Sequence, residues 1–507
     1  MNSHDQNIGL KYILRDGVAS QIMITLTSGT FLTAFALSLG ASNLLIGIMA
    51  SIPAIANLIQ IPAVYIVERY RDRRKISMFS SAISRSFILL IALLPCLVNY
   101  KLGIIFFILF LILQSAFSAI SGCSWNSWMR DLIPIHMLGS FFSRRMRFAT
   151  LSSIPMALLA GYFIDYWSSS YPNLMVFSYS IIFFFGYLSG LIGVYYISKI
   201  PEPGMLLKAE SNILRLFSQP MKDINYRNLL KFLGSWNFAV NLAAPFFTVY
   251  MLKRLDLSMS SIVLLMILGQ LMTFIFLHFW GRISDKFSNK SVLQICGPLF
   301  ILSILGWTFT TLPEKYILTI PLLIIIHATM GISAAGVSLA SGNITLKLAP
   351  EGNSTAYLAF SSIINSITAG IAPIIGGIFA DFFEKRELAL TLEWISPENK
   401  LLFETFNLKS WDFFFFLAFL IGLYSLHRLA NIHEGEEIQR KIIFNELFLE
   451  ARHGVRGFSN IGGGLRYMIQ FPFSTLLLVK KPDFLRRRLM RRIRSKNIYR
   501  YKKQSKN

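Results

Sequence analysis

The sequence predicts an all-α membrane protein in which twelve transmembrane helices form two parallel six-helix repeats, and three observations support this fold class. First, 54% of the 507 residues are hydrophobic and only 15% are charged, whereas a soluble domain carries roughly 25% charged residues. Second, the apolar residues fall in blocks of about 20, the length that crosses ~30 Å of hydrocarbon. Buried helices of a large soluble enzyme would show amphipathic stripes instead. Third, the two halves of the chain match at a constant spacing.

The apolar blocks give the expected helices. We expect them at 18–39, 44–66, 77–98, 102–122, 148–167, 174–198, 229–251, 261–280, 291–312, 316–340, 356–380 and 411–429. The first six form a bundle at 18–198 and the last six a bundle at 229–430. A tail (1–17) precedes the bundles, a linker (199–228) joins them, and a basic tail (431–507) follows.

The placement of the charges orients the chain. The net charge is +23, and the basic residues cluster at 69–75, at 130–147, in the linker and at 282–290, all on one side of the expected bundle. The short loops on the other side hold few charges, and the long 381–410 loop there is mixed. Cytoplasmic loops carry the excess of Lys and Arg. We therefore expect both termini, the linker and the basic tail in the cytoplasm.

An internal repeat appears when the chain is shifted by 216 residues. The shift superimposes Leu39 on Leu255, Ser42 on Ser258, Pro134 on Pro350, Gly161 on Gly377 and Asp165 on Asp381. Two halves in the same orientation are the parallel repeat of one large class of carriers, whose substrate site lies between the halves near the bilayer midplane.

A charged motif lies between helices 2 and 3 and again between helices 8 and 9. The second copy reads Gly281, Asp285, Lys286 and Lys290, and the first reads Val64, Glu68, Arg69, Arg73, Arg74 and Lys75. The motif resembles the signature of the major facilitator superfamily, although the first copy lacks the leading Gly and has Glu for Asp. The 125–147 loop is similar to one in poorly characterised bacterial members. The resemblance implies a secondary active transporter that moves a small solute by alternating access, and not an enzyme. The alternatives are a non-transporting scaffold or receptor, or a membrane-embedded enzyme.

Charged residues near this motif predict a conformational latch. A carboxylate that faces Arg or Lys across a short loop forms a charge-assisted contact that can hold one state. The candidates are Glu68, Arg69, Arg73, Arg85, Asp131, Asp285 and Lys286. Arg85 is expected to snorkel from helix 3 and to pair with Glu68 or Asp131. The alternative is that the arginines anchor the loop at anionic headgroups.

Polar residues within the spans predict the substrate site, because such groups are costly in the membrane and usually face a cavity or a partner helix. The resemblance implies that helices 1, 4, 7 and 10 line the cavity. The candidates are Gln21, Thr25, Gln114, Trp236, Asn237, Asn241 and His327. The repeat places Gln21 on Asn237 and Thr25 on Asn241. The alternative is helix packing, which we expect for Asn57, Gln60 and Asn365.

The coupling ion, the direction of transport and the solute stay open. Asp16, Asp165, Asp381 and Asp412 all fall at expected helix ends, so His327 is the one titratable group expected in mid-span. The few charges near the expected cavity favour a neutral, amphipathic or weakly charged solute.

The remaining expectations concern partners. The basic tail should lie on anionic lipid headgroups, no nucleic-acid partner is expected, and the protein should be a monomer. Cys96, Cys123 and Cys296 are isolated, so we expect no disulfide framework, no metal site and no cofactor.

Overall fold

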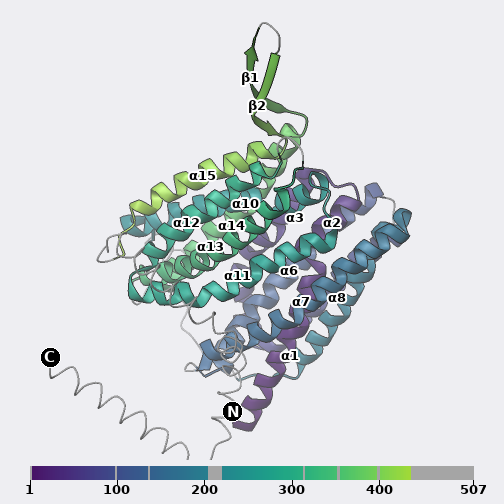
Figure 1. The fold of residues 1–507 in the computed structure, drawn as a ribbon. Coiled ribbons are helices and arrows are strands. Elements are labelled where there is room, and N and C mark those ends of the chain that lie inside the picture. The colour runs from purple at the N-terminus through teal and green to yellow at the C-terminus, as the bar shows by residue number, and fades with distance from the viewer. Residues whose placement is uncertain are drawn as a thin grey trace, which may run out of the picture. The chain divides into compact units, whose positions relative to one another are not determined.

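The computed structural model describes residues 3–97, 100–134, 137–203, 220–311, 315–350, 354–396 and 400–434. The chain divides into a unit at Met1–Gly435 and a second unit at Glu436–Asn507. The expected tail beyond 434 and its lipid contact lie outside the described residues, as does most of the expected linker. All of the architecture below belongs to the first unit (Figure 1).

Among the described residues, the first half contains six membrane helices, and the first two of them are interrupted. The segments are α1 (Ser3–Thr27), α2 (Gly29–Ser38), α3 (Asn43–Ala56), η1 (Asn57–Ile59), α4 (Gln60–Tyr70), α5 (Arg73–Leu97), α6 (Tyr100–Leu132), α7 (Leu138–Ser170), η3 (Pro172–Leu174) and α8 (Met175–Ser198). Helix 1 is α1 with α2, and helix 2 is α3 with η1 and α4. Because α1 begins at Ser3, much of the expected tail at 1–17 is helical.

The second half repeats this order. Its helices are α10 (Ile224–Lys253), α11 (Met259–Lys286), α12 (Asn289–Gly306), η4 (Trp307–Phe309), α13 (Thr319–Lys347), α14 (Ser354–Phe383) and α15 (Asp412–Ala430). Among the described residues, eleven segments are long and apolar enough to cross a membrane. Helix α10, with 30 residues, is the remaining long helix. The predicted all-α membrane fold is confirmed.

A β-hairpin replaces the loop that the sequence analysis expected at 381–410. Strands β1 (Glu387–Ile395) and β2 (Lys400–Lys409) pair antiparallel with Glu387 opposite Lys409. The expectation was wrong because the alternation of apolar residues along 388–394 has the period of a strand. Figure 1 shows the hairpin projecting from one end of the bundle. We call this end the hairpin face, and the end where α5 and α12 begin the linker face.

The described contacts between the halves come from segments near the hairpin face. Helix α3 packs on α14, α7 packs on α11, and α2 packs on α10. The continuations of helices 1 and 2 toward the linker face have different main neighbours: α1 packs on α8 and α7, and α4 packs on α6, all within the first half. The two halves are therefore joined mainly toward the hairpin face.

Candidate functional site

Helices 1 and 2 are both interrupted, and a cavity lies beside the interruptions. Helix 1 breaks between Thr27 and Gly29, where Gly29 has a φ of +59°, a conformation that glycine adopts without strain. Helix 2 tightens into the 3₁₀ turn at Asn57–Ile59 shortly after Pro53, and a proline removes a helical hydrogen bond. Broken helices commonly form the binding sites of transporters.

The cavity has a volume of about 360 Å³ and is built from the first half alone. Its lining residues are Met23, Ile24, Thr27, Ser28, Leu32, Met49, Ile52, Pro53, Asn57, Gln60, Ile88, Ile91, Leu111, Gln114, Ser115, Ser118, Ala119, Gly122 and Phe183. These side chains are apolar or neutral and polar. One wall is fixed by a bond of 2.8 Å from Ser84 Oγ to the Gln114 carbonyl, and Ser115 donates to Gln114 Oε1 at 3.2 Å. The arrangement can hold a small solute by neutral hydrogen bonds and apolar contact.

Only part of the predicted substrate set in the first half lines this cavity. Gln114 does, whereas Gln21 and Thr25 are not among its lining residues. Asn57 and Gln60, which we expected to pack helices, line it instead, and Gln60 donates to Asn57 Oδ1 at 3.2 Å. The 3₁₀ turn changes the helical register at this point, and the sequence pattern does not reveal such a turn.

The predicted residues of the second half already have protein partners. Asn237 Nδ2 donates to Asn365 Oδ1 at 2.9 Å, and Asn241 Nδ2 donates to the Asn237 carbonyl at 2.8 Å. Trp236 is buried beside two phenylalanines. His327 is buried against Trp307, with its Nδ1 2.8 Å from the Leu323 carbonyl. A substrate role for these four residues stays a prediction.

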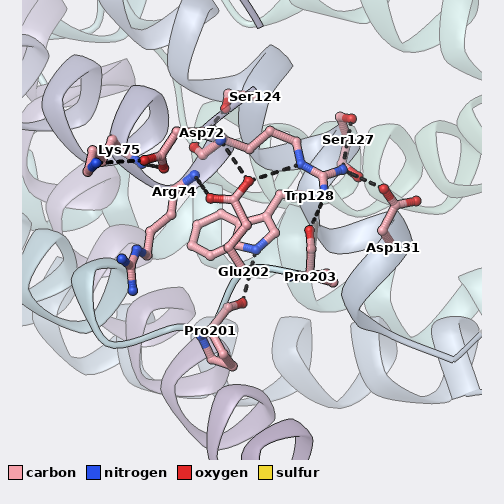
Figure 2. Close-up of polar contacts among 11 residues, drawn as sticks. Asp72, Arg74, Lys75, Ser124, Ser127, Trp128, Asp131, Pro201, Glu202 and Pro203 are labelled. Carbon is pink, nitrogen blue, oxygen red and sulfur yellow. Dashed lines mark hydrogen bonds and ion pairs between the residues drawn. The ribbon is translucent and has the colours of Figure 1, made fainter. Parts of the chain in front are cut away.

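A polar network at the linker face holds the start of the linker against α5 and α6. The Glu202 carboxylate accepts from the backbone N–H groups of Arg73 and Arg74 at 2.8 and 2.9 Å. The fully buried Arg73 guanidinium binds Asp131 at 2.5 Å and the Pro203 carbonyl at 2.8 Å. Figure 2 shows Glu202 between Arg74 and the α6 residues, with the indole of Trp128 donating to the Pro201 carbonyl. We call Glu202, Arg73 and Asp131 the linker clamp.

The second half has an equivalent network after its last helix. Glu434 accepts from the backbone N–H groups of Asn289 and Lys290 at 3.2 and 2.6 Å, and from the Lys347 ammonium at 3.2 Å. Asn289 and Lys290 are the residues that the 216-residue shift aligns with Arg73 and Arg74. We call Glu434, Asn289 and Lys347 the tail clamp. Sequence reasoning missed both glutamates, although each follows the last helix of its half at the same distance.

The predicted latch is only partly assembled. Arg73 and Asp131 meet in the linker clamp. The carboxylates that cap the N-termini of α5 and α12, however, are those of Glu202 and Glu434. Glu68 and Arg69 are exposed, and the Glu68 carbonyl accepts from Arg71. Asp285 lines a shallow cleft beside the tail clamp, and Lys286 lies over the Phe287 ring. Each clamp lies within one half, so its contacts do not join the halves.

Arg85 belongs to a buried charge cluster instead of the latch. It lies midway along α5, where it donates to the Gly190 carbonyl and, at 2.9 Å, to Ser20 Oγ. Asp16 is 2% exposed and lies 3.9 Å from Arg85 and 3.4 Å from Arg145. The expectation that Arg85 snorkels to pair with Glu68 or Asp131 was wrong, and Asp16 lies inside α1 instead of at a helix end. The reason is that α1, α5 and α8 enclose both side chains.

Metal binding finds no support in the side-chain geometry of the described residues. Within the described ranges, no group of three or more His, Cys, Asp or Glu side chains could hold a metal ion.

Comparisons with known proteins agree with this architecture. The nucleoside transporter NupG has a similar structure, with a TM-score of 0.62 at 12% identity over 84% of this chain and 100% of that one. The xylose transporter XylE from E. coli matches with a TM-score of 0.58 at 14% identity, over 87% of this chain and 98% of XylE. A bacterial homologue of the human lysosomal transporter Spinster matches with a TM-score of 0.54 at 14% identity, over 76% of this chain and 84% of the homologue. No curated protein sequence matches the chain.

These likenesses show the fold alone, and the family follows from the sequence profile. The profile of the Major Facilitator Superfamily matches residues 17–373 and, in a second alignment, 279–426. Together the matches cover most of the chain and both halves. The protein belongs to the major facilitator superfamily of membrane transporters.

Proposed function

We propose that this protein is a secondary active transporter that carries a small neutral solute by alternating access. The observation that carries the proposal is the uneven distribution of contacts between the halves. Segments α2, α3 and the ends of α7 and α14 join the halves toward the hairpin face, whereas α1 and α4 pack within their own half. Such a pair of rigid bundles can rock about a central site, so that each face opens in turn.

The linker face is assigned to the cytoplasm, so the conformation described here is inward-open. The basic loops lie at this face, and cytoplasmic loops carry the excess of Lys and Arg. In this orientation both termini are cytoplasmic, the hairpin is external, and a bacterial inner membrane is the site of action.

The chemistry of the cavity favours an uncharged solute with one polar edge and one apolar face. Asn57, Gln60 and Gln114 supply amide donors and acceptors, while Met49, Ile88 and others supply apolar surface. A charged solute would lose its hydration without gaining an opposite charge among the lining residues, and that loss is costly in a low-dielectric site. Nucleosides and pentoses have the favoured character.

A stabilisation screen of the purified protein tests this proposal. The probes are uridine, adenosine and D-xylose, with 5-aminolevulinic acid as a charged contrast. Proteins of similar fold include a nucleoside transporter, a D-xylose-proton symporter and a transporter in complex with this acid. A ligand at a hundredfold excess over its Kd stabilises the folded state by ~2.7 kcal/mol. We expect a neutral probe to raise the melting temperature and to cross proteoliposome membranes that contain the protein.

Matched variants locate the site. Gln114→Leu should raise the Kd of the stabilising probe about tenfold, the effect of losing ~1.4 kcal/mol of hydrogen bonding. Asn237→Ala should raise this Kd less. An equal loss of affinity in both variants would indicate that the site lies at the interface between the halves. Binding without flux through proteoliposomes would favour a receptor over a transporter.

A further inference from the structure

Among the described residues, four hydrogen bonds join the two halves at the hairpin face, and two aspartates accept all four. Asp165 near the end of α7 accepts from the N–H groups of Met259 and Ser260 at 2.8 and 2.9 Å. These are the first residues of α11, which belongs to the other half. A helix N-terminus presents unpaired amides and a partial positive charge. The Asp165 carboxylate satisfies both amides with its two oxygens.

The second aspartate repeats this contact with the roles of the halves exchanged. Asp381 near the end of α14 accepts from the N–H groups of Asn43 and Leu44 at 3.1 and 3.0 Å. These residues begin α3, in the first half. The 216-residue shift that aligns Asp165 with Asp381 also aligns Asn43 with Met259. Each half therefore donates one carboxylate and receives one.

Local caps make these carboxylates additions to already formed helix ends. Ser42 Oγ accepts from the Leu45 N–H, and Ser258 Oγ accepts from the Ser261 N–H, both at 3.3 Å. The serines cap α3 and α11 from within their own half. Loss of the aspartates would therefore leave both helix ends capped, so their contribution is to the contact between the halves.

Small residues one turn before each aspartate bring the helices together. A Cβ added to Gly377 would lie 2.6 Å from the Asn43 carbonyl oxygen, and one added to Gly161 would lie 3.2 Å from Ser260 Cα. The backbones are therefore almost in contact, as small residues permit between membrane helices. This approach places each carboxylate within hydrogen-bonding distance of the facing helix.

From these contacts we infer that Asp165 and Asp381 are the gate residues that close the solute pathway on the hairpin face. The inference rests on the proposed alternating access, and it assigns the two residues a role in setting the balance between the states. Rocking the halves apart at this face breaks all four bonds together. The clamps at Glu202 and Glu434 differ, because each stays within one half and survives the motion.

Distances between spin labels test the gate without a known solute. The labels go on cysteines introduced for Tyr171 and Lys385 at the hairpin face, and for Arg130 and Leu346 at the linker face, in a background without the natural cysteines. Each pair spans the two halves, and all four positions are exposed. The variants are Asp165→Asn, Asp381→Asn and the double substitution. Asp223→Asn is the control, since Asp223 caps α10 from within its own half.

We expect each gate variant to raise the ratio of open to closed molecules at the hairpin face by about threefold to tenfold. This is the effect of weakening charge-assisted hydrogen bonds. The double variant should approach the product of the two, because the sites are separate. The linker-face distance should shorten in step, and Asp223→Asn should match the parent.

Two results separate this inference from the proposed function. A folded double variant with the parental distances, in a protein whose parent carries a neutral solute, overturns the gate and leaves transport standing. A double variant that opens, in a protein that carries no probe solute, supports the gate and counts against transport.

Discussion

The two halves share their fold and their edge contacts, but they differ in their interiors. Asp165 and Asp381 occupy equivalent positions, and Glu202 and Glu434 cap equivalent helices. By contrast, helices 1 and 2 are broken where they line the cavity, whereas their counterparts α10 and α11 are continuous. Both halves therefore retain the contacts at the ends of their helices, whereas only the first half contains the broken helices that line the cavity.

The charge cluster shows the same division. The 216-residue shift places Asp16, Ser20 and Arg85 on Phe232, Trp236 and Ile301. The first set forms a buried polar network, and the second is buried in an apolar core. The cluster lies one helical turn from the cavity, since Ile88 follows Arg85 and lines it. We interpret the cluster as support for the wall of the cavity.

The largest expected difference between the halves follows from removing Arg85. Arg85→Met should destabilise the protein by about 3–5 kcal/mol, because Asp16 loses one of its two cationic partners in a buried site. Ile301→Val, at the equivalent position, should cost only about 0.5–1.5 kcal/mol. Unfolding in a detergent titration measures both. Similar losses would show that the cluster contributes no more than ordinary packing.

The two clamps should respond alike. Glu202→Gln and Glu434→Gln each remove a carboxylate that caps a helix and binds a cation, and each should cost about 1.5–3 kcal/mol of stability. The clamps lie within single halves, so the distances between the halves should not change. If either variant opened the linker or hairpin face in the spin-label experiment, that clamp would have to act between the halves.

The gate glycines should differ from each other. Gly377→Ala places a methyl group against a backbone oxygen and should cost the closed state about 1–3 kcal/mol, whereas Gly161→Ala meets a less crowded site and should cost less. The fraction of molecules open at the hairpin face measures both. A larger effect at Gly161 would contradict the packing described here.

The smallest effect is expected at Asp72, which caps α5 beside the linker clamp. Partial burial acts to raise the pKa of Asp72, but hydrogen bonds from the Lys75 backbone and side chain lower it overall. Its contribution is therefore present above its ordinary pKa of 3.8 and is lost as the pH falls below that value. Asp72→Asn should change stability by about 0.5 kcal/mol or less, because Asn also caps helices well. A melting curve at neutral pH that drops by several degrees would contradict this.

Much of the fold could be predicted from the sequence, because hydrophobic blocks and a constant repeat specify it. The same repeat also aligned Asp165 with Asp381 before any contact was known. The shift does not align Glu202 with Glu434, because the hairpin lengthens the second half after Asp381 and the spacing between equivalent residues changes there. A search for acidic residues just beyond the last helix of each half would have found them.

The interior could not be predicted in the same way. The pairing of Asp16 with Arg85 depends on the rotation of α1 and α5 about their axes, which hydropathy does not specify. The break at Gly29 and the 3₁₀ turn at Asn57–Ile59 are local backbone conformations that a single glycine or proline permits but does not require. The cavity residues follow from those breaks, which is why Asn57 and Gln60 were assigned to packing.

A reversible cross-link at the hairpin face tests the central claim most directly. Gly161→Cys with Ser260→Cys, in a background without other cysteines, introduces two thiols at facing positions of α7 and α11, because a Cβ at Gly161 would lie 3.2 Å from Ser260 Cα. We predict that oxidation stops flux of the solute found in the screen, leaves its stabilising effect on the protein intact, and is reversed by a reductant. Undiminished flux through the fully cross-linked protein would contradict alternating access by separation of the halves at this face.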